Sequence, residues 1–302
     1  MPVTIQIQQP ISDRLGESFR VYLHWMKELF SIPDIEKIII DLSGLTFVYP
    51  FVALPLAAKI IQLKAIGYQI EIIKGHNSGD YLSTLLFPEG LDPKILPQWN
   101  PILNHYRNRT YLPICLIPAG RLTNETLIRE NLLSLFGDIL INQLGITGQL
   151  NSSLSYIISE YMANIVDHAQ FENGMIMVQN YPTKGYLDLC ILDTGIGLLN
   201  SYINNGITEI TTHENAIKEA INGKSTKDMP ERGYGLSTTR KMLVSGLKGE
   251  YLLVSGNAFY VWTAKYEQIL TLPLNQTWQG TIFFLRIPKT IPPDFNYVNY
   301  LE

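Results

Sequence analysis

The stretch Gly185-Tyr-Leu-Asp-Leu-Cys-Ile-Leu-Asp-Thr-Gly-Ile-Gly197 decides the fold of the C-terminal half of this chain. Its apolar run predicts a buried strand, and the strand ends at Asp193. Gly195 and Gly197 permit positive φ or a close approach of the backbone to a ligand. A buried carboxylate at this place can accept a hydrogen bond from an exocyclic amine such as that of adenine. The alternative is an ordinary Asp-Thr-Gly turn.

A helix predicted over residues 152–169 precedes this strand. It carries Glu160, Asn164 and His168 at intervals of four, so all three project from nearly one face. A carboxylate can orient or deprotonate an attacking water or hydroxyl, and the Asn carbonyl oxygen can ligate Mg²⁺ that bridges phosphates. The alternatives are a solvated polar stripe and, for His168, a structural hydrogen bond to the backbone.

A polar, glycine-rich segment follows, from Gly223-Lys-Ser-Thr226 to Arg232-Gly-Tyr-Gly235, and leads into a helix predicted over residues 236–247. Backbone amides and a helix N-terminus in such a loop can bind phosphates. The candidate phosphate contacts are Lys224, Ser225, Thr226, Lys227 and Arg232. The alternative is a mobile surface loop. A dinucleotide-binding motif is not indicated, because the glycines at 195 and 197 lack a third partner. The full phosphate-loop pattern of the Walker type, Gly-x-x-x-x-Gly-Lys-Ser/Thr, is also absent, because Lys218 stands where its first glycine would be.

Composition limits the class of protein. The chain has 302 residues, 46% of them hydrophobic, which predicts two globular domains. A net charge of -4 with only 23 Lys+Arg argues against a nucleic-acid binder. Cys115 and Cys190 lie in apolar runs and are expected to be reduced core residues. The sequence predicts neither a signal peptide nor a membrane span, and we expect a cytoplasmic protein without a membrane partner.

Strands and helices alternate along the N-terminal third. Strands are predicted at 3–8, 37–42 and 68–73 and helices at 15–30 and 50–66, a spacing typical of a parallel crossover unit. Prolines accumulate between residues 88 and 101 and predict a linker. We therefore expect an N-terminal domain at 1–92, a linker at 93–110 and a C-terminal domain at 111–302. Both domains are expected to be of the α/β class.

Taken in order, the motifs of residues 151–288 resemble those of the GHKL ATPase superfamily, which includes histidine kinase catalytic domains and anti-sigma serine kinases. Glu160 and Asn164 match its N box, and 193–197 match its first glycine box. Gly233, Tyr234, Gly235 and Leu236 match the second glycine box, and Gly280 with Thr281 resembles its final Gly-Thr element. The resemblance implies a Bergerat-type two-layer α/β sandwich with a mixed sheet.

The same resemblance implies a role for each motif. Asp193 would hold adenine, Asn164 would hold Mg²⁺, Glu160 would be the catalytic base, and residues 224–235 would be the lid. The order Asn164-Ile-Val-Asp-His168-Ala is most similar to the anti-sigma serine kinases. The ATP-binding set that follows is Asn164, His168, Asp193, Gly195, Gly197, Lys224, Ser225, Thr226, Arg232, Gly233, Tyr234, Gly235, Leu236 and Thr281.

Residues 3–91 resemble the STAS domain of anti-sigma-factor antagonists through Ile38-Ile-Ile-Asp-Leu-Ser-Gly-Leu-Thr-Phe47. Where that family has a phosphorylatable hydroxyl at the helix start, this chain has Tyr49-Pro50-Phe51. The resemblance therefore implies a docking or lid-controlling module rather than a phosphorylation switch. The alternative is a plain α/β domain of another family.

The expected function is Mg-ATP binding in a signalling protein. A serine/threonine kinase or regulatory ATPase acting on a protein partner is favoured. An ATP hydrolase that drives a conformational cycle and a non-catalytic, nucleotide-gated binding module remain alternatives. A homodimer is compatible with the resemblance, although the sequence shows no heptad seam.

Overall fold

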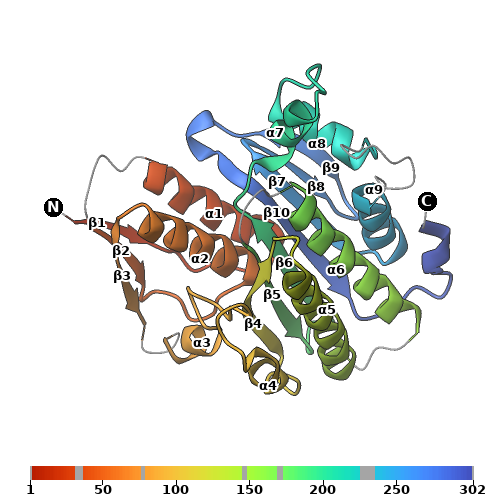
Figure 1. Ribbon diagram of the computed structural model, residues 1–302, viewed down its shortest axis with the longest axis horizontal. Coiled ribbons are helices and arrows are strands. Elements are labelled where there is room, and N and C mark those ends of the chain that lie inside the picture. The colour runs from red at the N-terminus through yellow and green to blue at the C-terminus, as the bar shows by residue number, and fades with distance from the viewer. Residues whose placement is uncertain are drawn as a thin grey trace.

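The computed structural model describes residues 2–30, 37–75, 79–144, 148–168, 173–224 and 235–300. The chain is of the mixed α/β class, with a small parallel sheet and a large antiparallel sheet (Figure 1). The small sheet has the order β1-β2-β3, and the large one has the order β4-β5-β6-β10-β7-β8-β9.

The small sheet is formed as the N-terminal alternation predicts. Both of its strand pairs are parallel, and the crossovers are α1 and α2. Ile38, Ile40 and Leu42 of β2 point into the core. Its elements are β1 (Val3–Gln6), α1 (Leu15–Phe30), β2 (Lys37–Leu42), α2 (Pro50–Ala65) and β3 (Gln69–Lys74).

The large sheet contains seven strands, each antiparallel to its neighbours. A mixed sheet was predicted. β6 and β7 do run in the same direction, but β10 lies between them and pairs antiparallel with both, so they never become neighbours. The strands are β4 (Tyr111–Pro118), β5 (Asn173–Tyr181), β6 (Tyr186–Asp193), β7 (Glu250–Gly256), β8 (Ala258–Trp262), β9 (Glu267–Thr271) and β10 (Trp278–Pro288).

Helices connect these strands, and most were predicted. Thr212 caps α8 by accepting the backbone N–H of Asn215 at 3.1 Å. α9 continues directly into the π-helix η1 (Lys241–Gly246). The α-helices of this part are α3 (Gly79–Thr84), α4 (Trp99–Asn104), α5 (Thr123–Leu144), α6 (Gln149–His168), α7 (Gly197–Asn204), α8 (His213–Ile221) and α9 (Gly235–Arg240). Two 3₁₀ turns, η2 (Leu274–Gln276) and η3 (Tyr297–Tyr300), flank β10.

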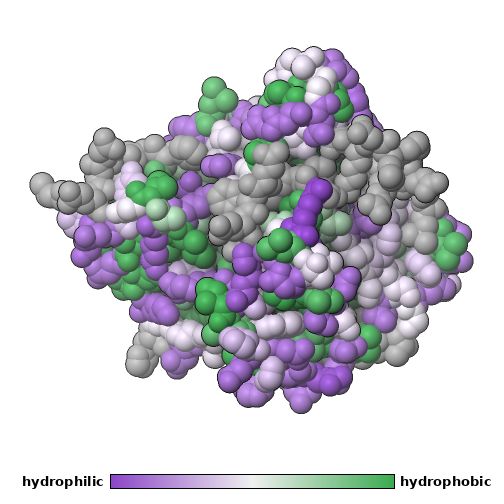
Figure 2. All heavy atoms as spheres, viewed as in Figure 1, coloured by the Kyte–Doolittle hydropathy of each residue, from purple (hydrophilic) through white to green (hydrophobic). Residues whose placement is uncertain are grey.

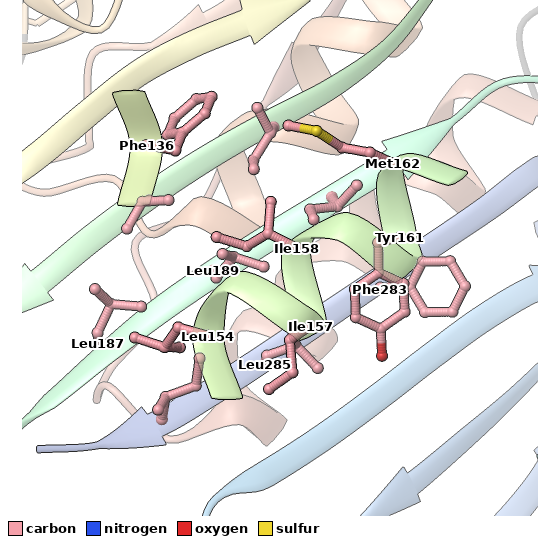
Figure 3. Packing of buried hydrophobic residues seen from close by; sticks show 14 of the residues in the cluster. Phe136, Leu154, Ile157, Ile158, Tyr161, Met162, Leu187, Leu189, Phe283 and Leu285 are labelled. Atoms are coloured by element: carbon pink, nitrogen blue, oxygen red, sulfur yellow. The ribbon is translucent and has the colours of Figure 1, made fainter. Parts of the chain in front are cut away.

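One face of the large sheet carries α5 and α6. Along β6 and β10, alternate residues point to this face and pack under α6 (Figure 3). The ring of Tyr161 lies 4.3 Å, centroid to centroid, from that of Phe283. This packing holds α6 across the strands and fixes where its polar residues lie.

The opposite face of the large sheet is covered by α1 and α2, which lie between the two sheets (Figure 1). The rings of Phe19 on α1 and Phe259 on β8 pack with their centroids 4.4 Å apart. The rings of Phe51 on α2 and Phe284 on β10 pack with their centroids 5.7 Å apart. Residues 50–58 of α2 are all buried, because the helix has a sheet on each side. The N-terminal and C-terminal parts therefore share one hydrophobic cluster.

The range predicted as a linker contains structured residues. It forms α4, whose Trp99 and Leu103 join the core under α5. Leu91, just before this range, adds a parallel bridge to Cys115 at the edge strand β4. The independent folding of 1–92 and 111–302 stays a prediction.

On the face shown in Figure 2, hydrophilic residues are interspersed with small apolar groups. Among the described helices, none is both long and apolar enough to cross a lipid bilayer. Cys115 and Cys190 are buried free thiols.

Candidate functional site

The candidate site begins at the C-terminal end of β6. Here a row of cross-strand neighbours runs from Gly174 of β5 through Asp193 to Thr281 of β10 and Ser255 of β7. In its pairing with β7, β10 has a register shift between Trp278 and Thr281, the residue that faces Asp193 on β6. The row brings together two motifs that are almost ninety residues apart in the sequence.

The side chain of Asp193 is buried, with 7% of the residue exposed. Its Oδ1 accepts the backbone N–H of Gly195 at 2.8 Å, and Thr281 contributes backbone and side-chain hydrogen bonds. Burial raises the pKa of Asp193 to about 6, and these hydrogen bonds oppose that rise. No ion pair joins Asp193 to a basic side chain within the described residues. The donors that the described residues supply to this carboxylate are thus neutral.

Glycines allow the backbone to close tightly around Asp193. Gly280 has φ +102°, and a Cβ at this position would lie 2.2 Å from the backbone oxygen of Asp193. Gly197 has φ +73° and lies against Gly280, with 3.1 Å from its virtual Cβ to the Gly280 oxygen. Both positions therefore require glycine for conformational and steric reasons.

Two residues of this site were missed by the sequence analysis. Ser255 accepts the backbone N–H of Leu198 at 3.0 Å and donates to the oxygen of Gly280 at 3.1 Å. Trp278 donates its indole N–H to the backbone oxygen of Asp193 at 3.2 Å. The pair Ser255-Gly256 at the end of an apolar run was an available signal in the sequence, and the structure gives Gly256 a positive φ of 62°.

α6 lies close to the same row of strand ends. Gly174, the neighbour of Asp193 on β5, has no room for a side chain because its virtual Cβ would be 2.5 Å from Cδ1 of Ile165. Ile165 follows Asn164 on α6. The half-buried Asn164 has an amide nitrogen that is buried without a hydrogen-bond partner. Its carboxamide is therefore not fully engaged in holding the fold.

Glu160 lies one turn earlier on α6 and contacts the first residue of α9. A Cβ at Gly235 would be 1.9 Å from Oε2 of Glu160, so this carboxylate packs directly against the glycine. A carboxylate is electrostatically favoured at the start of a helix. The contact brings the motif on α6 together with the end of the second glycine motif. Leu236, the next residue, packs against the hydrophobic cluster under α6.

Lys224 makes its contacts with Glu209 and Tyr202. Its Nζ binds Glu209 Oε1 at 2.8 Å, and this carboxylate raises the pKa of Lys224. Its backbone oxygen accepts the hydroxyl of Tyr202 at 2.6 Å. In this structure Lys224 therefore anchors the loop before α8 rather than offering a free ammonium group.

The remaining predicted residues lie outside the described part of the chain. These are Ser225, Thr226, Lys227, Arg232, Gly233 and Tyr234, and the side chain of His168 belongs with them. In the described ranges no three His, Cys, Asp or Glu residues gather into a metal-binding group.

Taken together, the described residues form a polar site at one end of the large sheet. It offers a buried hydrogen-bond acceptor (Asp193), a carboxamide whose nitrogen has no hydrogen-bond partner (Asn164), a carboxylate (Glu160) and closely approaching glycine backbone. Such a set can bind a ligand with an amine at one end and a metal or polar group at the other.

Comparison with family models, with curated proteins and with solved structures found no match to this chain.

Proposed function

We propose that this site binds Mg-ATP, in the manner implied by the resemblance of residues 151–288 to GHKL ATPases. The observation that carries the proposal is the buried carboxylate of Asp193, held by neutral donors at a strand end where glycines bring the backbone close. An acceptor of this kind selects a ligand with an exocyclic amine, because a ligand without it leaves a buried oxygen unpaired.

Asn164 is the residue that would hold Mg²⁺. Its amide nitrogen has no hydrogen-bond partner, so the fold does not fully engage this side chain, and a carboxamide oxygen is a suitable hard ligand for Mg²⁺. When bound, the metal would neutralise charge on the β- and γ-phosphates. A Mg²⁺ ion that is bound mainly by the phosphates of ATP needs few ligands from the protein. Asn164 alone would therefore be enough on the protein side.

The start of α9 and the residues before it would receive the phosphates. Glu160 lies against Gly235, so it is at the boundary between α6 and this region. In that position a carboxylate can orient a water or a hydroxyl for attack on the γ-phosphate. This contact favours a kinase or regulatory ATPase over a purely nucleotide-gated binding module. A hydrolase that drives a conformational cycle remains the alternative.

The N-terminal, STAS-like part would serve the same signalling function as a docking module for a protein partner. Its helices α1 and α2 pack on the large sheet, and Tyr49 occupies the start of α2. Motion of α1 or α2 would therefore reach the strands that hold Asp193.

Calorimetric titration with ATP and Mg²⁺ tests the binding proposal. We expect saturable binding by the wild type and a loss of about 100-fold or more in affinity for Asp193→Asn. Asp138→Asn, an exposed change on α5, is the matched control and should bind as the wild type does. Absence of binding by folded wild-type protein would overturn the proposal.

The fate of the γ-phosphate is tested separately with labelled ATP. Glu160→Gln should lose about 10²- to 10⁴-fold in turnover while it still binds ATP. Glu130→Gln, exposed on α5, is its control. Label on a protein supports a kinase, released phosphate supports a hydrolase, and neither product from the wild type would eliminate both enzyme classes.

A further inference from the structure

The strand β9 ends the seven-stranded sheet, and its outer edge has no strand beside it in the described part of the chain. The opposite edge is protected. There, Leu91 donates to Ile114 O and accepts from Leu116 N, each at 2.8 Å. Unpaired edges are places where another chain can add a strand, so the two ends of this sheet differ in what they can bind.

The hydrogen bonds at the two ends of the β8–β9 hairpin show which backbone groups face outward. Thr263 N donates to Tyr266 O at 2.9 Å, and Leu272 N donates to Asn257 O at 2.6 Å. Because antiparallel pairs alternate, Gln268 and Leu270 bond to β8. The N–H and C=O groups of Glu267, Ile269 and Thr271 therefore point away from the sheet.

We propose that β9 pairs with β9 of a second copy of this chain, antiparallel and with the twofold axis at Ile269. In this register Ile269 faces its own counterpart and Glu267 faces Thr271, so each hydrogen-bonded pair joins two residues whose backbone groups point outward. Pro273 would face Lys265, and because proline has no N–H the ladder ends there. In this twofold-symmetric register, the outward backbone N–H and C=O groups of one β9 form hydrogen bonds with those of the other.

The side chains of this edge suit a second copy. Glu267 binds Arg240 Nη1 at 3.2 Å and the Tyr260 hydroxyl at 2.6 Å, so its charge is compensated within its own chain. Leu270 is 45% exposed and would lie opposite Gln268 of the other copy, with the two Leu270 side chains diagonal to each other. Residues 267–271 contain neither the lysine nor the proline that commonly protects an edge.

The pairing involves five residues from each copy, and such a small interface predicts a weak dimer with a Kd on the order of micromolar. Sedimentation across a concentration series tests it. We expect the wild type to change from monomer to dimer and Leu270→Lys to weaken the dimer by about 10-fold or more, because two ammonium groups would lie diagonal to each other across the twofold axis and repel. Ile95→Lys, at a 73% exposed site near the protected edge, is the control and should dimerise as the wild type does.

A crosslink tests the register itself. The double variant Gln268→Cys/Leu270→Cys places cysteines in facing, non-hydrogen-bonded pairs with Cα atoms about 4.5 Å apart, which suits a disulfide. Gln268→Cys alone has no facing cysteine. The two native cysteines are buried. Mild oxidation should produce a covalent dimer of the double variant only. A wild type that stays monomeric, a Leu270→Lys dimer of unchanged strength, or equal crosslinking of both cysteine variants would overturn the proposal.

Discussion

Two buried carboxylates lie five residues apart on the strand β6, and they differ in their bonding partners. Asp188 is bound by Arg286 in a bidentate ion pair, with distances of 2.7 and 2.9 Å. Among the described residues, Asp193 accepts hydrogen bonds from the backbone N–H groups of Gly195 and Thr281 and from the Thr281 hydroxyl. Because their separation is odd, the two side chains point to opposite faces of the sheet. Asp188 faces the N-terminal part, and Asp193 faces the side of α6.

The difference separates a carboxylate that is paired with a cation in the fold from the one that we propose binds a ligand. Arg286 also donates to the backbone oxygen of Asp13, whose side chain binds Lys184 at 2.8 Å. Asp188 is therefore part of a tie between the two halves of the chain. In the described part of the chain no cation compensates the buried Asp193 carboxylate, and an uncompensated buried carboxylate is costly to the fold and more common at functional sites.

The largest expected loss of stability follows from breaking the ion pair between Asp188 and Arg286. Arg286→Met leaves a buried carboxylate without its cation, and we expect the free energy of unfolding to fall by about 3 to 5 kcal/mol. Urea denaturation at pH 7.5 measures it. A loss below about 1 kcal/mol would mean that the ion pair does not hold the fold. Lys184→Met, which changes a 44% exposed cation nearby, is the control for loss of charge.

The next effect is at the backbone around Asp193. Gly280→Ala adds a Cβ 2.2 Å from the Asp193 oxygen at φ +102°, and we expect a loss of about 2 to 4 kcal/mol. Gly206→Ala is matched to it, because Gly206 has φ +78° but no atom within 4 Å of the added Cβ. It should lose only about 1 kcal/mol. Equal losses in thermal unfolding would show that close packing at Gly280 is unimportant.

The Asp193 carboxylate itself should destabilise the protein at neutral pH. Burial raises its folded pKa to about 6, above the unfolded value of about 3.9. Stability from its protonation is thus fully present below about pH 4 and is lost as pH rises through about 6. Asp193→Asn should therefore gain about 1 to 3 kcal/mol at pH 8 and little at pH 4. Urea curves at both pH values check this, and an Asn variant that is less stable at pH 8 would contradict it.

The smallest expected loss of stability follows from substitution of Asp13. Hydrogen bonds from Lys184 and Tyr186 lower the pKa of Asp13 to about 2, so its contribution is present above about pH 4 and is lost as pH falls toward 2. Lys184 is well exposed, so solvent screens the pair and Asp13→Asn should lose less than about 1 kcal/mol. A double-mutant cycle with Lys184→Met isolates the coupling. A coupling above about 2 kcal/mol would show that this exposed pair matters as much as Arg286.

The sequence predicted the local elements around the site because each has a strong local signal. The run that ends at Asp193, the Thr212 cap and the crossover through α2 are examples. α7 was missed, since its N-cap Ile196 makes no side-chain cap and the helix depends on packing against α8. Partners distant in the chain, such as Trp278 and Asp193, depend on strand order, which a local pattern does not encode.

The placement of α2 between two sheets was also missed, although its sequence contained a signal. Residues 50–58 are apolar on every side, which is typical of a helix buried on both faces. The prediction of two separate domains gave this pattern no role. β9 was missed for the opposite reason, because residues 267–271 are short and mostly exposed.

The central claim is that Asp193 recognises an amine on a purine, and competition between ATP and inosine triphosphate tests it most directly. The two ligands differ in the purine ring system chiefly by the exocyclic amine, which inosine replaces with a carbonyl oxygen. We predict that the wild type binds ATP about 100-fold or more tightly than inosine triphosphate and that Asp193→Asn removes this preference. Equal binding of both ligands by the wild type, or an unchanged preference in the variant, would contradict the account.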